Sequence, residues 1–116
     1  MTKPKEKKAT NSGRNRWQDA EEIRWAVRSW AIRIGVRSPR IHIRGMKRKW
    51  ASISAVGRLT LDSQLLEFPK ELGEFVIVHE PVHLLAPNHG RVFKSFMLAC
   101  LPDWEKRERV LQKFGR

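Results

Sequence analysis

The chain has 116 residues and a mass of 13.6 kDa, which suits one domain with a single hydrophobic core. Hydrophobic residues make up 41% of it, enough for a modest core, so a wholly disordered protein is not expected. No apolar run approaches the ~20 residues of a membrane span, and no apolar stretch of a secretory signal follows the N-terminal lysines. A single cysteine excludes the disulfide-rich secreted class. We therefore expect a small cytoplasmic protein without membrane association.

The charge is strongly positive. Lys and Arg number 24 and Asp and Glu 12, which gives a formal net charge of +12 and a pI near 10.9. Such an excess attracts polyanions such as nucleic acid and accelerates encounter with them. The alternative is that the charge only keeps a small protein soluble.

The first half of the chain predicts a basic tail, one helix and three short strands. Met1 to Arg16 is nearly free of apolar residues and is expected to be a disordered basic tail. Gln18 to Val36 has the apolar spacing of three and four that is typical of an amphipathic helix. Arg40 to Met46, Trp50 to Ser54 and Arg58 to Leu61 have the composition of strands. The last two strands are expected to form a hairpin whose turn contains Gly57.

The second half predicts three helices. They cover Lys70 to Ala86, Gly90 to Leu101 and Trp104 to Phe114. Pro87 ends the first of them, and Asn88 is a candidate cap for the second. The whole order indicates an α+β domain over residues 17–116, with an N-terminal helix and two C-terminal helices around the central one. The helices should pack on one side of a small antiparallel sheet of about three strands.

One run of residues carries the pattern of a metal site. His79 and His83 frame the sequence His-Glu-Pro-Val-His, and on a helix residues four apart lie on the same face. Neutral imidazole is a natural zinc ligand, and Glu80 is placed to take a proton from a metal-bound water. His89, six residues after His83 and beyond the stop at Pro87, supplies a third ligand if a turn brings it back.

Other interpretations of these residues remain open. A five-residue H-E-x-x-H match also arises by chance, and most buried histidines are only hydrogen-bonded. We interpret His42, in a basic strand, as a surface residue and Cys100, on an apolar helix face, as a core residue.

The sequence from Phe75 to Phe93, followed by Leu101-Pro-Asp-Trp, resembles the YgjP-like family of small zincin metallopeptidases. The Asn-His-Gly-x-x-Phe element is shared with the related WLM group, and the SprT group is a more distant relative. Upstream, Lys49 to Ser54 and Gly57 to Leu61 are similar to a Trp-Gly-Ser-Cys-Ser strand and hairpin of the family. The resemblance extends over more than half of the chain, with its pieces in the right order.

The resemblance implies a compact zincin fold with one catalytic Zn²⁺ and with protein or peptide as substrate. By it, His79, His83 and His89 are the metal ligands and Glu80 is the catalytic general base. WLM and SprT relatives include proteases that act on proteins attached to DNA, and the charge of +12 is compatible with DNA as a partner. The oligomeric state is not predicted.

The chain departs from the family pattern at four positions. Ala51, Ile53 and Asp62 stand where glycine, cysteine and asparagine are usual, which affects none of the implied ligands. Pro81 lies inside the motif, where a proline removes a helix hydrogen bond at a cost of about 3 kcal/mol and disfavours helical angles at Glu80. Two outcomes are open: a kinked helix that still joins both ligands to one ion, or a displaced Glu80 and a disabled site.

Three functions follow. The first is a zinc endopeptidase; since the chain has no tyrosine to hold the oxyanion, Arg44 and Arg48 are candidate replacements, although solvated arginines are the commoner case. The second is a non-catalytic, basic nucleic-acid-binding module with a relic or structural zinc site. The third is an accessory protein that docks through its charged last helix. We adopt the first.

Overall fold

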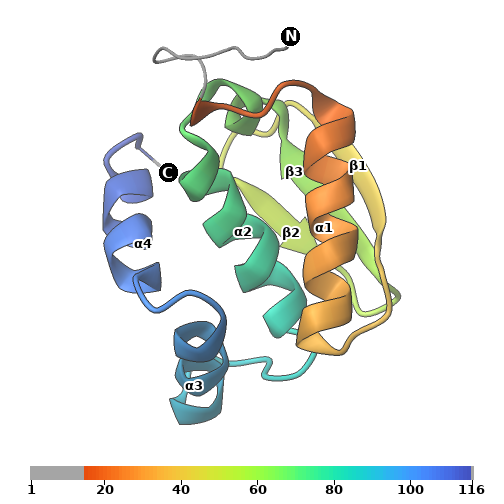
Figure 1. Ribbon diagram of the computed structural model, residues 1–116, viewed down its shortest axis with the longest axis vertical. Helices are drawn as coiled ribbons and strands as arrows, with labels where there is room; N and C mark the ends of the chain where they lie inside the picture. Colours follow the sequence, from red (N-terminus) through yellow and green to blue (C-terminus); the bar gives the residue numbers. More distant parts are fainter. Residues whose placement is uncertain (1–14, 116) are drawn as a thin grey trace, which may run out of the picture.

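A computed structural model of the chain describes residues 15–115. The predicted tail, residues 1–16, therefore lies almost wholly outside the described residues. Within these described residues, four α-helices, three strands and the 3-10 helix η3 follow one another (Figure 1). In chain order they are α1 Ala20–Ile34, β1 Arg40–Arg44, β2 Ala51–Ile53, β3 Arg58–Asp62, η3 Ser63–Glu67, α2 Lys70–Val82, α3 Arg91–Cys100 and α4 Trp104–Gln112.

Helix α1 has a clear start and stop. The side chain of Asp19 accepts a hydrogen bond from the amide of Glu22 at 2.9 Å, which satisfies a free donor of the first turn. Gly35 ends the helix with φ of 90°, a left-handed angle that only glycine adopts without strain, and its amide donates to Ala31. The apolar stripe faces the core as its spacing predicts. Its buried residues are Ile23, Val27, Trp30 and Ala31.

The sheet is mixed, with the strand order β1-β3-β2. The predicted hairpin is confirmed: β2 and β3 are antiparallel, and Gly57 in their turn has φ of 90°. The prediction of an antiparallel sheet is wrong for β1, which pairs with β3 in parallel, with Arg40 opposite Arg58. Residues 45–50 carry the chain past the middle position to form β2 at the far edge, and the hairpin then returns β3 between the two earlier strands.

Helices α1 and α2 lie side by side over one face of this sheet, with α3 and α4 beyond α2 (Figure 1). The placement of helices on one side is as predicted. Helix α2 runs through the centre of the molecule, and from Phe75 to Val78 its residues are buried on every side. Among the helices of residues 15–115, none has the length and apolarity to cross a membrane.

Helix α2 ends earlier than predicted, at Val82 instead of Ala86, because of Pro81. Proline has no amide for the carbonyl of Ile77, and the amides that follow turn to nearer acceptors. His83 donates to Glu80 and Leu84 to Pro81, both at 3.0 Å and both over three residues. The last turn is thus tightened into 3-10 form. The ring of Pro81 itself is fully buried against the core.

Hydrogen bonds from one arginine join helix α4 to α2. Arg107 donates to Glu74 Oε1 at 2.8 Å and to the carbonyl of Glu71 at 3.2 Å. Glu74 also accepts from the indole of Trp30 at 3.2 Å, so its carboxylate joins α1, α2 and α4. This network holds α4 along the side of α2 that leads to the histidines.

Candidate metal centre

Three histidines meet where α2 ends. His79 and His83 project from the last turns of α2, and His89 lies in the loop before α3. One nitrogen of each imidazole lies within 4.8 Å of the other two, and the Nε2 atoms of His83 and His89 are 2.9 Å apart. The turn after Pro87 thus brings His89 back over the helix. Pro81 does not separate the two helical histidines, because their ring centroids are 4.7 Å apart.

Hydrogen bonds orient two of the rings. His83 Nδ1 donates to the carbonyl of Ala86 at 3.3 Å, which leaves its Nε2 with a free electron pair. His79 Nδ1 donates to Glu80 Oε2 at 3.0 Å, which likewise leaves Nε2 of His79 available. Metal-bound histidines usually donate their second N–H to a carbonyl or carboxylate in this way. Both rings are therefore held in the tautomer that a metal requires.

Phe93 forms a buried platform beneath the three imidazoles. Its ring is stacked on His83 at 4.8 Å between centroids, lies 4.5 Å from His89 and contacts His79 edge-on at 5.2 Å. Phe93 comes from α3 and is almost fully buried. It positions side chains from two separate segments, since a ring that touches all three restricts their rotation.

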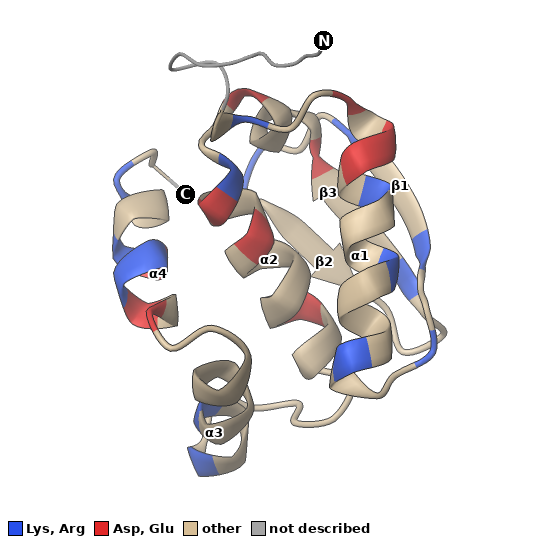
Figure 2. Ribbon diagram, in the orientation of Figure 1, with Lys and Arg blue, Asp and Glu red and all other residues tan. Residues whose placement is uncertain are grey.

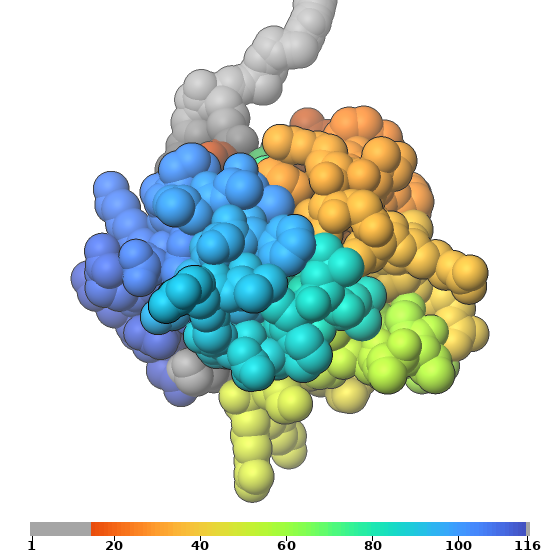
Figure 3. Space-filling model, turned by 90° about the horizontal axis from the view of Figure 1, so that it is seen from below, coloured from red at the N-terminus to blue at the C-terminus, as the bar shows by residue number. Residues whose placement is uncertain are grey.

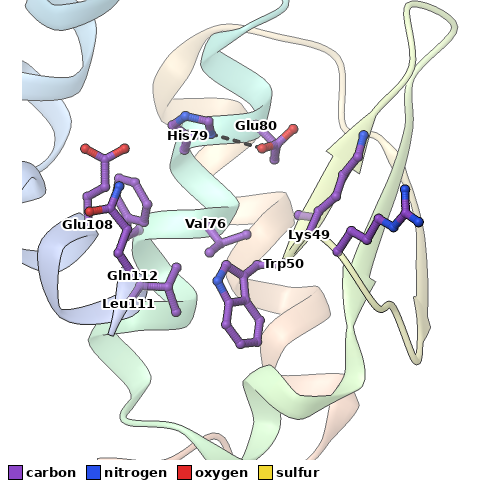
Figure 4. A pocket seen from close by; sticks show the side chains of 11 residues that line it. Lys49, Trp50, Val76, His79, Glu80, Glu108, Leu111 and Gln112 are labelled. Atoms are coloured by element: carbon purple, nitrogen blue, oxygen red, sulfur yellow. Dashed lines mark hydrogen bonds and ion pairs between the residues drawn. The ribbon is translucent and has the colours of Figure 1, made fainter. Parts of the chain in front are cut away.

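A cavity opens beside His79 and Glu80. It has a volume of about 260 Å³. Lys49 and Trp50, just before β2, lie on one side of it, and Leu111 and Gln112 of α4 lie on the other (Figure 4). Phe75 and Val76 add apolar surface. An apolar hollow with a few polar groups is suited to hold one side chain of a ligand.

The pKa of His83 is lowered from its usual value of 6.5, chiefly by burial and then by the neighbouring His79. The unfolded chain therefore binds more protons just below pH 6.5, so the free energy of unfolding of the metal-free protein should decrease as the pH falls through that window. Urea unfolding with a chelator present, between about pH 7.5 and 5.5, measures this slope. His83→Gln should flatten it, and an equal slope in both proteins would contradict the assignment.

The other sequence predictions have mixed outcomes. Arg48 lines the cavity, whereas Arg44 donates to the carbonyl of Gly45 and is not among the cavity residues. His42 is exposed on β1, as predicted for a surface residue. Cys100 packs half-buried against the core, as predicted, and burial raises the pKa of its thiol.

The sequence interpretation missed Phe93 as part of the site, together with the contribution of α4 to the cavity. The phenylalanine of the Asn-His-Gly-x-x-Phe element was a usable signal, because it follows His89 closely in the sequence and lies on the apolar face of the predicted helix. Nothing in the sequence indicates that Leu111 reaches the cavity, since that depends on how α4 packs.

Known proteins agree with this architecture. The YgjP-like, metallopeptidase domain family matches residues 2–114. The crystal structure of the metallopeptidase zymogen of Methanocaldococcus jannaschii jannalysin has a TM-score of 0.70 and 29% identity, covering 79% of this chain and 96% of that one. That of Pyrococcus abyssi abylysin, also a metallopeptidase zymogen, has a TM-score of 0.72 and 22% identity, covering 80% and 94%. No curated protein matches the chain. With a family match over nearly its whole length, the chain belongs to the YgjP-like metallopeptidases.

Proposed function

We propose that the protein is a zinc peptidase in which His79, His83 and His89 bind the metal and Glu80 is the general base. The observation that carries the proposal is the convergence of three imidazoles from two segments. Membership of a metallopeptidase family supports the reaction class and a protein or peptide substrate.

The donor set suits zinc. Three neutral nitrogens with an open fourth position are a common arrangement in catalytic zinc sites. Ligands of one tetrahedral zinc at 2.0–2.1 Å lie roughly 3.4 Å apart, and the three nitrogens here lie within 4.8 Å of one another. Without a metal, the contact between Nε2 of His83 and Nε2 of His89 requires that one nitrogen carry a proton and the other accept it. A bound cation would replace that proton and accept the electron pairs of both nitrogens.

The residues around the metal have separate roles. Zinc, when bound, polarises a carbonyl and lowers the pKa of a water. Glu80, on the cavity wall, would serve as the general base that takes a proton from an attacking water and returns it to the leaving amine. The cavity binds a neighbouring side chain, and β2, an edge strand, offers its free edge to an extended peptide. Arg48, also on the wall, is the nearer of the two arginines proposed to stabilise the oxyanion.

The remaining parts of the proposal concern the domain bounds, the cellular compartment and a second partner. We place the peptidase domain at residues 17–116, in the cytoplasm, with DNA as a second partner that the charge of +12 supports. The alternative function, a nucleic-acid-binding module with a relic or structural zinc, uses the same surface charge. It is favoured over the peptidase if peptide hydrolysis is absent while metal and nucleic acid are both bound.

Metal content tests the ligand set directly. The purified protein should hold close to one zinc per chain, and His89→Ala should lose most of it, because two imidazoles alone bind zinc weakly. His42→Ala is the matched control, since His42 is an exposed histidine outside the cluster. Elemental analysis after dialysis gives the stoichiometry. Retention of zinc by His89→Ala would contradict the proposed ligand set.

A further inference from the structure

A further carboxylate stands on the wall of the cavity beside His79 and Glu80. It belongs to Glu108 of α4, which lines the cavity together with Leu111 and Gln112. The three residues are three and four positions apart, so they lie on one face of the helix. The face of α4 that forms the far wall of the cavity thus includes an ionisable group.

Glu108 lies toward the metal centre within this wall. Trp104, at the start of α4, contacts Phe93 with 6.3 Å between the ring centroids. Phe114, after the end of α4, stacks on Phe68 before the start of α2, with 4.3 Å between the centroids. Helix α4 therefore runs antiparallel to α2, and of its three cavity residues Glu108 is the one nearest to the histidines.

Glu108 is half-buried on this wall. Among residues 15–115, no hydrogen bond or ion pair reaches its carboxylate. Helix α4 carries charges of both signs (Figure 2), but its half-buried arginine, Arg107, pairs with Glu74 at 2.8 Å and with Asp103 at 2.9 Å. Burial without a compensating contact is unfavourable for an anion, because it removes part of the hydration shell. A cationic group of a ligand would supply that contact.

Two cationic residues on the opposite wall face the solvent. Arg48 and Lys49 line the cavity from the segment before β2, and both are exposed. Seen from below, that segment, drawn in yellow, projects from the surface (Figure 3). Figure 4 shows the side chain of Lys49 extending away from α4. Water and salt screen exposed charges strongly, so Glu108 is the charge that a ligand meets on the α4 side of the cavity.

We propose that Glu108 makes the cavity selective for a lysine or arginine side chain of the substrate. The methylene groups of such a side chain pack on Val76 and Leu111, and its charged end turns to Glu108. An acidic side chain in the same place is repelled, and an aliphatic one gains only the apolar contact. One carboxylate in a side-chain pocket is enough to select basic residues in trypsin. The inference rests on the proposed peptidase function, because the cavity adjoins its catalytic groups, and it adds the class of side chain.

Peptides that differ at a single position test the selectivity. Three quenched fluorescent peptides carry lysine, leucine or glutamate at the centre of an otherwise uncharged sequence. The zinc-loaded chain should cleave the lysine peptide with a kcat/KM about tenfold or more above that of the glutamate peptide. Glu108→Gln should lower this ratio by about fivefold, mainly through a higher KM for the lysine peptide, and Glu108→Lys should reverse the order.

Glu105→Gln is the matched control. Glu105 is an exposed residue of α4 that is not among the cavity residues, and its replacement makes the same change in net charge as Glu108→Gln. It should keep the wild-type ratio of the two peptides. An equal fall of the ratio in both variants would overturn the proposal, since only the net charge would then matter.

Calorimetric titration of zinc-loaded Glu80→Gln with the lysine and glutamate peptides separates this inference from the peptidase function. If the wild type hydrolyses neither peptide but the lysine peptide binds more tightly, and Glu108→Gln removes the difference, the peptidase function fails and the inference holds. If both peptides are hydrolysed at rates that Glu108→Gln leaves in the same ratio, the inference fails and the peptidase function holds. Absence of a preference for lysine in both measurements would also overturn the inference.

Discussion

Glu80→Gln is expected to lower peptide hydrolysis by about 10²–10⁴-fold while the zinc content stays unchanged. Glutamine keeps the shape of the side chain, and its carbonyl oxygen still accepts from His79 Nδ1, the contact that Glu80 makes at 3.0 Å. It cannot accept a proton at neutral pH, however, and only the chemical step should suffer. Cleavage of an unfolded protein by the zinc-loaded chain, read on a gel and with a quenched fluorescent peptide, gives the rate.

Glu80→Ala separates the two roles of this carboxylate. It removes the base and also the acceptor that orients His79, so zinc affinity should fall by about 10–100-fold in addition to the loss of activity. Hydrolysis by Glu80→Gln at the wild-type rate would exclude Glu80 as the base. If the wild type is inactive and Pro81→Leu is active, the proline has disabled the site, and the proposed peptidase activity does not apply to the natural chain.

Local patterns predicted most of the elements. The apolar spacing of α1 depends on residues close together in the sequence, so it is visible without the fold; the caps Asp19 and Gly35 each lie one residue inside the predicted range of residues 18–36. The same holds for His79 and His83, whose separation of four residues matches the helical repeat. The return of His89 required only that the chain turn after Pro87, which proline and the Asn-His-Gly sequence favour.

Features that depend on packing were not predictable in this way. The parallel pairing of β1 with β3 follows from which strand takes the middle position, and alternation along a strand is the same in either direction. The network of Arg107, Glu74 and Trp30 joins three helices, and no spacing in the sequence indicates it. The far wall of the cavity, formed by Leu111, depends on that network.

The effect of Pro81 on helix α2 depends on how close the proline lies to the end of the helix. In mid-helix a proline leaves a carbonyl without its partner and bends the axis. Here it lies one residue before the end of α2, the following amides form three-residue hydrogen bonds, and the ring fills core space. The sequence left open whether the two histidines still meet; in the structure their rings are in contact. The position of Glu80 toward a substrate is what the hydrolysis experiment tests.

Phe93→Ala should destabilise the protein by about 3–5 kcal/mol, because it empties a buried site in the core. It should also weaken zinc binding, since the ring that contacts all three imidazoles is gone and each gains rotational freedom. Phe93→Leu, the control, keeps most of the volume without the stacking contacts and should cost less than Phe93→Ala in stability.

Urea unfolding with and without zinc separates the two effects. The gain in unfolding free energy on adding zinc reports the affinity for the folded state, independently of the stability of the metal-free chain. That gain should shrink in Phe93→Ala, and in Phe93→Leu to a smaller extent, because leucine still limits the space in which the rings rotate. If both variants keep the full gain, Phe93 is only a core residue, and the histidines are positioned by the bonds of His83 to Ala86 and of His79 to Glu80 alone.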